Sequence, residues 1–175
     1  NVETELLLLS AGGISFAPET SITYQGDSLG LGSFDTVEVV DVDLYAADEI
    51  SVRSLDRVVF NNVSLKTSGS GVHDAIELLA HREIAVDNLI FNENIKRIAM
   101  EAQTVNLSNL NFPNGSEVKL NSAHGAIDGK YPNFNNIMWG RVNFINNVRY
   151  SDNLIMNKTA FDTHAGNISI GKIGN

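Results

Sequence analysis

The sequence predicts an all-β protein, a right-handed parallel β-helix whose coils each take up about 21 residues. In the middle of the chain, apolar residues recur at a constant spacing of 21 positions. Within each recurrence they alternate with polar residues, which is the pattern of short strands with one buried face. Asn, Gly and Pro separate the alternating segments, as expected for tight corners between strands.

The clearest repeat lies in two segments, REIAVDNLIFNEN at 82–94 and QTVNLSNLNFPNG at 103–115. If each strand stacks on its counterpart one coil away, at about 4.8 Å, the matching apolar positions become buried inside the coil. The predicted core residues are Ile84, Val86, Leu89 and Phe91 in the first segment, and Val105, Leu107, Leu110 and Phe112 in the second.

Shorter segments extend this repeat in both directions. Residues 63–65 lie 21 positions before residues 84–86, and the triplets at 76–78, 98–100 and 118–120 follow one another at spacings of 20–22. Each triplet is apolar, variable, apolar. Because Asn tolerates left-handed backbone conformations, we expect it at the corners, where stacked amides can form ladders between coils.

Four segments depart from the regular repeat. The Gly- and Ser-rich stretches at 27–33 and 66–75 are expected to be loops. Residues 122–160 contain many turn formers and the single Trp, and are expected to cover one side or end of the stack irregularly. The final stretch, GNISIGKIGN, alternates again through Ile168, Ile170 and Ile173, which predicts a last coil or an edge strand.

The stretch HDAIELLAHREI at 73–84 fits two secondary structures. Its residues Ile76, Leu79 and Ala80 would share one face of an amphipathic helix. Its flanks, however, match the longer repeat. We therefore expect strands here and keep a helix as the alternative.

Composition favours a single folded domain over residues 1–175, because 43% of the residues are hydrophobic and only 19% are charged. The net charge of -9 argues against nucleic acid as a partner, since binding to phosphates requires clustered Lys and Arg. Solubility explains the acidity, with recognition of a basic partner as the alternative. The chain has no Cys, which excludes disulfides, thiolate nucleophiles and Cys-based metal sites.

The apolar run near the beginning of the chain is not expected to be a signal peptide or a membrane anchor. This run, at residues 6–9, is far shorter than the roughly 18 residues needed to span a bilayer, and it follows Glu3 and Glu5 instead of basic residues. The chain starts without Met and directly in a predicted strand. We therefore expect a piece of a longer solenoid protein, whose unpaired end strands favour edge-to-edge self-association.

Several segments together resemble a known family: IELLAHREIAVDNLIF, KRIAMEAQTVNLSNLNFPNGSEVKLNS, GRVNFINNVRY and FDTHAGNISIGKI. They are similar to the carboxy-terminal part of large bacterial surface proteins of the filamentous-haemagglutinin or autotransporter-passenger type, over roughly residues 50–175. The NPNL motif of the haemagglutinin secretion domain does not occur here. The resemblance implies a β-helical shaft, a secreted or cell-surface location in a Gram-negative bacterium, and adhesion to a glycan or to another cell's surface.

Many β-helices are polysaccharide lyases or hydrolases, so an enzyme is the alternative. β-Helical pectin hydrolases carry an Asp-Asp pair with Gly-His-Gly and Arg-Ile-Lys motifs. This chain has no Asp-Asp, and its His124-Gly125 and Arg97-Ile98 lack their companions. Carboxylates could still converge from adjacent coils to form the acid and base that glycoside hydrolysis requires. We expect a non-enzymatic protein, without a cofactor.

Two weaker hypotheses concern single residues. Asp41 and Asp43 alternate with apolar residues, so they would share the outward face of one strand and could bind Ca²⁺ there; a solvated strand face is the alternative. His73, next to Asp74, could orient Ser70 as a nucleophile, although loop polarity explains both residues. The remaining histidines, His81, His124 and His164, are dispersed, and no metal site is expected.

One aromatic concentration stands out, in which Tyr131, Phe134 and Trp139 are interleaved with Asn residues. Exposed aromatic rings beside amides commonly stack on sugars and bond to them, so these three residues are the candidate ligand-binding site. The alternatives are an aromatic plug over the end of the helix and a self-standing glycan-binding module. Taken together, the sequence predicts a structural or adhesive segment of a surface protein.

Overall fold

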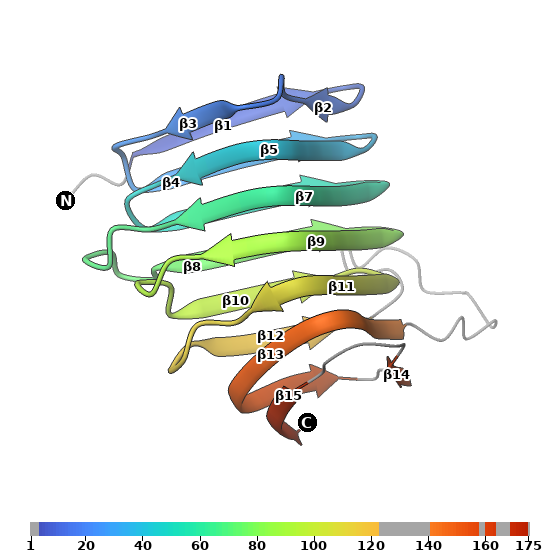
Figure 1. The fold of residues 1–175 in the computed structure, drawn as a ribbon. Helices are drawn as coiled ribbons and strands as arrows, with labels where there is room; N and C mark the ends of the chain where they lie inside the picture. The colour runs from blue at the N-terminus through green and yellow to red at the C-terminus, as the bar shows by residue number, and fades with distance from the viewer. Residues whose placement is uncertain (1–3, 123–140, 158–159, 164–168, 175) are drawn as a thin grey trace.

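A computed structural model describes residues 4–122, 141–157, 160–163 and 169–174. Within these ranges the chain is all β, and parallel strands stack into a β-solenoid of about six turns with a spacing near 22 residues. The coils wind in a right-handed sense from β1 to β15 (Figure 1). The predicted parallel β-helix is therefore confirmed. The described ranges hold no helix long and apolar enough to cross a membrane.

Two stacks of strands form the coil walls, and every pairing between neighbouring coils is parallel. We call them the first and the second sheet. The first sheet contains, in order down the stack, β1 (Glu5–Ser10), β4 (Ser28–Ser33), β6 (Glu49–Ser54), β8 (Ala75–Ala80), β10 (Arg97–Glu101), β12 (Glu117–Asn121) and the last residues of β13 (Arg141–Asn157).

The second sheet faces the first across the apolar interior and has longer strands (Figure 1). Its members are β2 (Ile14–Ser15), β3 (Thr20–Thr23), β5 (Val37–Tyr45), β7 (Arg57–Lys66), β9 (Glu83–Phe91), β11 (Thr104–Asn111) and the first part of β13. Below it, β14 (Ala160–Thr163) and β15 (Ser169–Gly174) both pair with β13, which confirms a last strand near residues 168–173.

The interior is a continuous column of aliphatic and aromatic side chains. The repeat predicted at 82–115 is confirmed, because Ile84 pairs with Val105 and Leu89 with Leu110, all at most 2% exposed. The strand prediction for residues 75–80 and 83–84 also holds. Here alternation wins over the helical pattern because every second side chain has an interior position in the stack.

The predicted alignment of residues 63–65 with 84–86 is wrong. In the structure Val63 pairs with Leu89 and Val58 pairs with Ile84, a step of 26 positions. The loop at 67–74 follows β7 and lengthens this coil by five residues relative to the 21-residue step between β9 and β11. Loop residues therefore shift the apparent period without disturbing the stacking.

The predicted loop at 27–33 is also wrong, because residues 28–33 form β4, which pairs with β1 and β6 in the first sheet. Leu29 and Leu31 point into the core, and Gly30 and Gly32 occupy the outer face. A Cβ atom on either glycine would lie 2.6 Å from a methyl group of Leu7 or Leu9 on β1. The glycines thus allow two leucine side chains to lie across the strand, and they do not mark a turn.

The predicted irregular segment at 122–160 is wrong for its described second half. Residues 141–157 form β13, which continues the second sheet and then the first. Its alternation is hidden by a register shift opposite Leu107 and Ser108. On both sides of this shift, Phe144 and Val148 point into the core and are fully buried.

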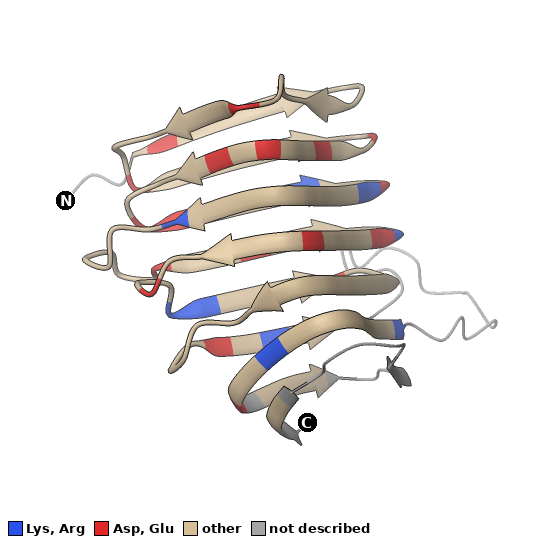
Figure 2. Cartoon of the chain, viewed as in Figure 1, with Lys and Arg blue, Asp and Glu red and all other residues tan. Residues whose placement is uncertain are grey.

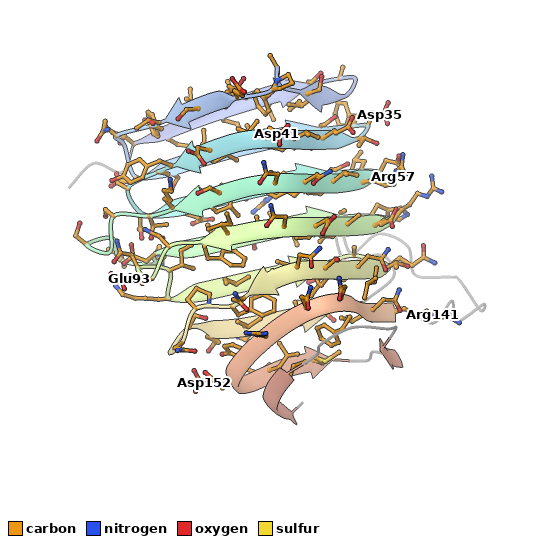
Figure 3. The ribbon with its side chains drawn as sticks, viewed as in Figure 1. Asp35, Asp41, Arg57, Glu93, Arg141 and Asp152 are labelled. Atoms are coloured by element: carbon orange, nitrogen blue, oxygen red, sulfur yellow. The ribbon has the colours of Figure 1, made fainter. Side chains whose placement is uncertain are left out.

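A ladder of polar residues marks one corner of the second sheet, midway along its strands. Asp41, Asn62, Asn88, Asn109 and Asn147 all have positive φ values, between 46° and 55°. The Asn62 amide donates to the Asp41 carboxylate at 2.6 Å, and the Asn88 amide donates to Asn62 Oδ1 at 2.8 Å (Figure 3 labels Asp41, on β5). The expected Asn corners and ladders are confirmed.

Candidate functional site

The outer face of the first sheet carries two rows of side chains that run down the stack. The strand register aligns these side chains one coil above another, about 4.8 Å apart. On β12 an acidic and a basic band lie close together on this face (Figure 2). The first row contains Glu49, Ala75, Arg97 and Glu117, and the second contains Ser51, Glu77, Ala99 and Lys119.

The upper part of this face is hollowed into what we call the apolar groove, with a cavity volume of about 730 Å³. Gly30 and Gly32 lie at its floor. Four exposed apolar side chains line it: Leu7 (49% exposed), Leu9 (73%), Phe34 (68%) and Leu55 (46%). Clustered exposed apolar side chains are typical of binding surfaces.

Below it lies the charged groove, with a cavity volume of about 350 Å³. Small residues, Ala75 and Ala99, leave gaps between the longer side chains of their rows. Its charged lining residues are Glu49, Arg53, His73, Glu77, Arg97, Glu117 and Lys119. The charged groove therefore contains both acidic and basic side chains.

Ion pairs within the charged groove fix some of these side chains. Arg53 Nη2 lies 2.9 Å from Glu77 Oε2, and Lys119 Nζ lies 2.8 Å from Glu117 Oε1. Among the described residues, no carboxylate lies within ion-pair distance of the Arg97 guanidinium. Arg97 is consequently the cation of this groove that is most available to a ligand.

Glu49 and Arg53 line both grooves, which therefore adjoin at these two side chains; we call the two grooves together the furrow, and its lining extends from β1 to β12. Burial raises the pKa of the Glu49 carboxyl, and the nearby negative charge of Glu77 raises it further. Glu77 accepts hydrogen bonds from Arg53 and from Ser51 Oγ. The furrow thus holds two carboxyl groups in different electrostatic surroundings.

The loop at 67–74, confirmed at the predicted place, stands beside the charged groove and is organised by two buried carboxylates. Asp48 Oδ1 accepts the backbone N–H groups of His73 and Asp74, both at 2.6 Å. Asp74 is fully buried and accepts Lys96 Nζ at 2.6 Å and the Gly69 N–H at 2.9 Å. The loop backbone is therefore fixed from inside.

Acid should weaken the fold through Asp74. Burial alone would raise its pKa, but hydrogen bonds from Lys96 and Gly69 outweigh burial and hold the pKa below its usual value. A lowered folded-state pKa contributes stability above the unfolded-state pKa of about 3.9, and that stability is lost as the pH falls through the folded-state value. In denaturant titrations, we expect the stability advantage of wild type over Asp74→Asn to shrink below about pH 4. A constant difference from pH 6 to pH 2.5 would contradict this assignment.

The structure separates the residues of the proposed calcium site. Asp41 occupies the left-handed corner, which interrupts the alternation of β5, so it does not share a face with Asp43. Its carboxylate accepts the Asn62 amide, and Asp43 lies 3.7 Å from Lys66. In the described part of the chain, no group of three or more His, Asp or Glu side chains could hold a metal ion.

Of the other predicted site residues, the structure describes Ser70, His73 and His81. Ser70 Oγ lies 2.9 Å from Ser68 Oγ, and His73 contributes its backbone N–H to Asp48. His81 directly follows β8, and His124 and His164 lie outside the described residues. The aromatic candidates Tyr131, Phe134 and Trp139 also lie outside them.

Sequence reasoning missed the furrow. Its residues come from six different strands, so no local motif contains them. The predicted alignment of the triplets at 76–78, 98–100 and 118–120 is confirmed, and it places Ala75, Arg97 and Glu117 in one row. Only the step from Glu49 to Ala75 requires the length of loop 67–74. Comparison of the chain with models of known protein families, with curated proteins and with solved structures finds no match.

Proposed function

We propose that this chain is a non-enzymatic structural and adhesive segment of a large secreted or surface-displayed bacterial protein, and that the outer face of its first sheet is the adhesive face. The continuous apolar interior and the parallel ladder bonds support the structural part, because each coil stabilises its neighbours. The resemblance to haemagglutinin-like and autotransporter passengers supports the Gram-negative surface location. The furrow supports adhesion.

The ligand that best suits the furrow is a neutral glycan chain lying along the stack. The furrow crosses six strands from β1 to β12, which corresponds to about 24 Å at the usual strand spacing. That shape favours an extended polymer. This adjacency of the two grooves on one face is the observation on which the adhesive proposal depends.

The chemistry of the lining favours sugar over other polymers. Sugar rings present apolar C–H faces, which suit Phe34 and the leucines of the apolar groove. Hydroxyl groups both donate and accept hydrogen bonds, which suits a lining of carboxylates and cations. A polyanion would meet three glutamates on a chain of net charge -9, and a polycation would meet Arg53, Arg97 and Lys119.

Replacing Arg97 should weaken glycan binding. We expect Arg97→Ala to lose roughly ten- to hundredfold in affinity for whichever neutral hexasaccharide of glucose, xylose or mannose binds wild type, since a hydrogen bond to a charged group contributes about 1.5–3 kcal/mol. Isothermal titration calorimetry measures this. The matched control is Arg57→Ala, on the second sheet at the far end of β7 (Figure 3). Equal losses in both variants would remove the furrow as the binding face.

A β-helical carbohydrate-active enzyme is the second candidate, and one observation favours it. Glu49, with its raised pKa, and Glu77, held by Arg53, occupy the same groove, as an acid and a carboxylate partner would. Under the adhesive proposal, prolonged incubation leaves the hexasaccharides intact. Release of shorter sugars by wild type, abolished in Glu49→Gln, would establish the enzyme instead.

The first described coil supports edge-to-edge self-association. On β1 the inward leucines Leu6 and Leu8 are only partly buried, whereas their partners on β4, Leu29 and Leu31, are at most 1% exposed. Another strand that pairs with β1 would cover Leu6 and Leu8 and would hydrogen bond to the backbone of β1. Light scattering should therefore show mass rising with protein concentration. A monodisperse monomer at millimolar concentration would contradict this expectation.

A further inference from the structure

Loop 67–74 is longer than its position in the fold requires. At the same corner of the neighbouring coils, residues 46–48, 92–96 and 112–116 connect the second sheet to the first. Three to five residues are therefore enough to turn this corner, and loop 67–74 uses eight. The additional residues play no part in strand stacking.

Side chains from two neighbouring coils hold this loop. Asp48, on the preceding coil, accepts two loop N–H groups, and the loop's Gly71 packs against it so closely that a Cβ there would lie 2.2 Å from Asp48 Oδ1. From the following coil, the Asn92 and Asn94 amides donate to the Thr67 carbonyl at 2.7 and 3.2 Å. Lys96, on the same coil as Asn92 and Asn94, forms an ion pair with Asp74 of the loop.

The hydrogen bonds that hold loop 67–74 exceed those required to turn the chain at this corner. Burying carboxylates has a desolvation cost, which is offset here only because several donors converge on each one. The result is a rigid loop whose tip projects beside the charged groove. At this tip Val72 is 84% exposed, and the next residue, His73, lines the groove. Rigid loops on a scaffold commonly carry recognition residues.

We propose that loop 67–74 is a preorganised recognition wall of the charged groove, and that Val72 and His73 contact the glycan. This inference rests on the function proposed above. The Val72 methyl groups would pack on the C–H face of a sugar ring, and the His73 imidazole would hydrogen bond to a ring hydroxyl. Because the wall stands at one side of the furrow, it selects among sugars by their shape at that side.

The test compares Val72→Ser and His73→Ala with wild type in calorimetric titrations against the glucose, xylose and mannose hexasaccharides. Both residues are exposed, so both variants should fold. We expect each to lose about fivefold to tenfold in affinity for the best ligand and to change the order of preference among the three sugars. Ile90→Ser is the matched control, because Ile90 is a 53% exposed β-branched residue on the second sheet.

The outcomes separate the two proposals. If wild type binds a hexasaccharide and both loop variants bind all three sugars as wild type does, the role of the loop is overturned and the furrow proposal survives. If wild type binds none of the three, the adhesive proposal itself fails, and the loop assignment with it. A loss in the loop variants with Ile90→Ser unchanged supports both.

Discussion

Replacing Phe112 with alanine is expected to destabilise the fold by about 3–5 kcal/mol, as is usual when a buried aromatic side chain is removed. Phe112 is only 4% exposed and sits between two other rings. Its ring centroid lies 5.9 Å from that of Phe91 in a stacked geometry and 5.6 Å from that of Tyr150 in an edge-on geometry. The change therefore leaves a cavity between the rings of Phe91 and Tyr150 on the two neighbouring coils. Denaturant unfolding followed by circular dichroism measures the loss.

The matched control for this prediction is Phe34→Ala. It removes the same atoms from a ring that is 68% exposed in the apolar groove, so the stability should change by less than about 0.5 kcal/mol. Similar losses in the two variants would mean that the aromatic column is not the stabilising element. Hydrogen exchange shows where Phe112→Ala loses protection. A loss of protection confined to the coils below β11 would indicate that the stack unfolds in parts.

The second large effect is expected at the corner ladder, where Asn88→Ala should lose about 2 kcal/mol. Asn88 has φ of 55°, a conformation that costs an ordinary L-residue roughly 1–2 kcal/mol, and its amide donates to Asn62 Oδ1 at 2.8 Å. Alanine loses the hydrogen bond and is strained. Thermal or urea unfolding of the purified variant gives the difference.

Asn88→Gly separates the two contributions. Glycine adopts positive φ readily, so this variant loses the side-chain hydrogen bond but not the backbone conformation. We expect it to lose less than half as much stability as Asn88→Ala. If the glycine variant were as destabilised as the alanine variant, the left-handed corner would not be the reason for Asn at this position.

The interior of the solenoid could be predicted because stacking imposes the repeat on the sequence. Phe91 and Phe112 lie 21 positions apart, and their rings stack in the structure. In contrast, β4 was missed because Gly30 and Gly32 are typical loop residues, and only their contacts with Leu7 and Leu9 explain them as strand residues. Tertiary packing on the outer face overrides the local turn signal there.

The candidate site was harder to predict than the fold. Arg97 was noticed in the sequence only as part of an incomplete enzyme motif, and its significance comes from its place in a row with Glu49 and Glu117. The sequence predicted the 22- and 20-residue steps from Ala75 to Arg97 and Glu117, but not the 26-residue step that joins Glu49 to this row. Outer faces also lack the apolar constraint that makes the interior periodic.

The location of the native protein is the most direct test of the proposed function. An immunoblot of fractionated cells, with an antibody against this segment, reports both apparent mass and compartment. A segment of a surface adhesin predicts a band many times larger than 19.0 kDa in the surface or culture-medium fraction. A soluble cytoplasmic band near 19.0 kDa would contradict the proposal and would favour an enzyme that uses Glu49 and Glu77.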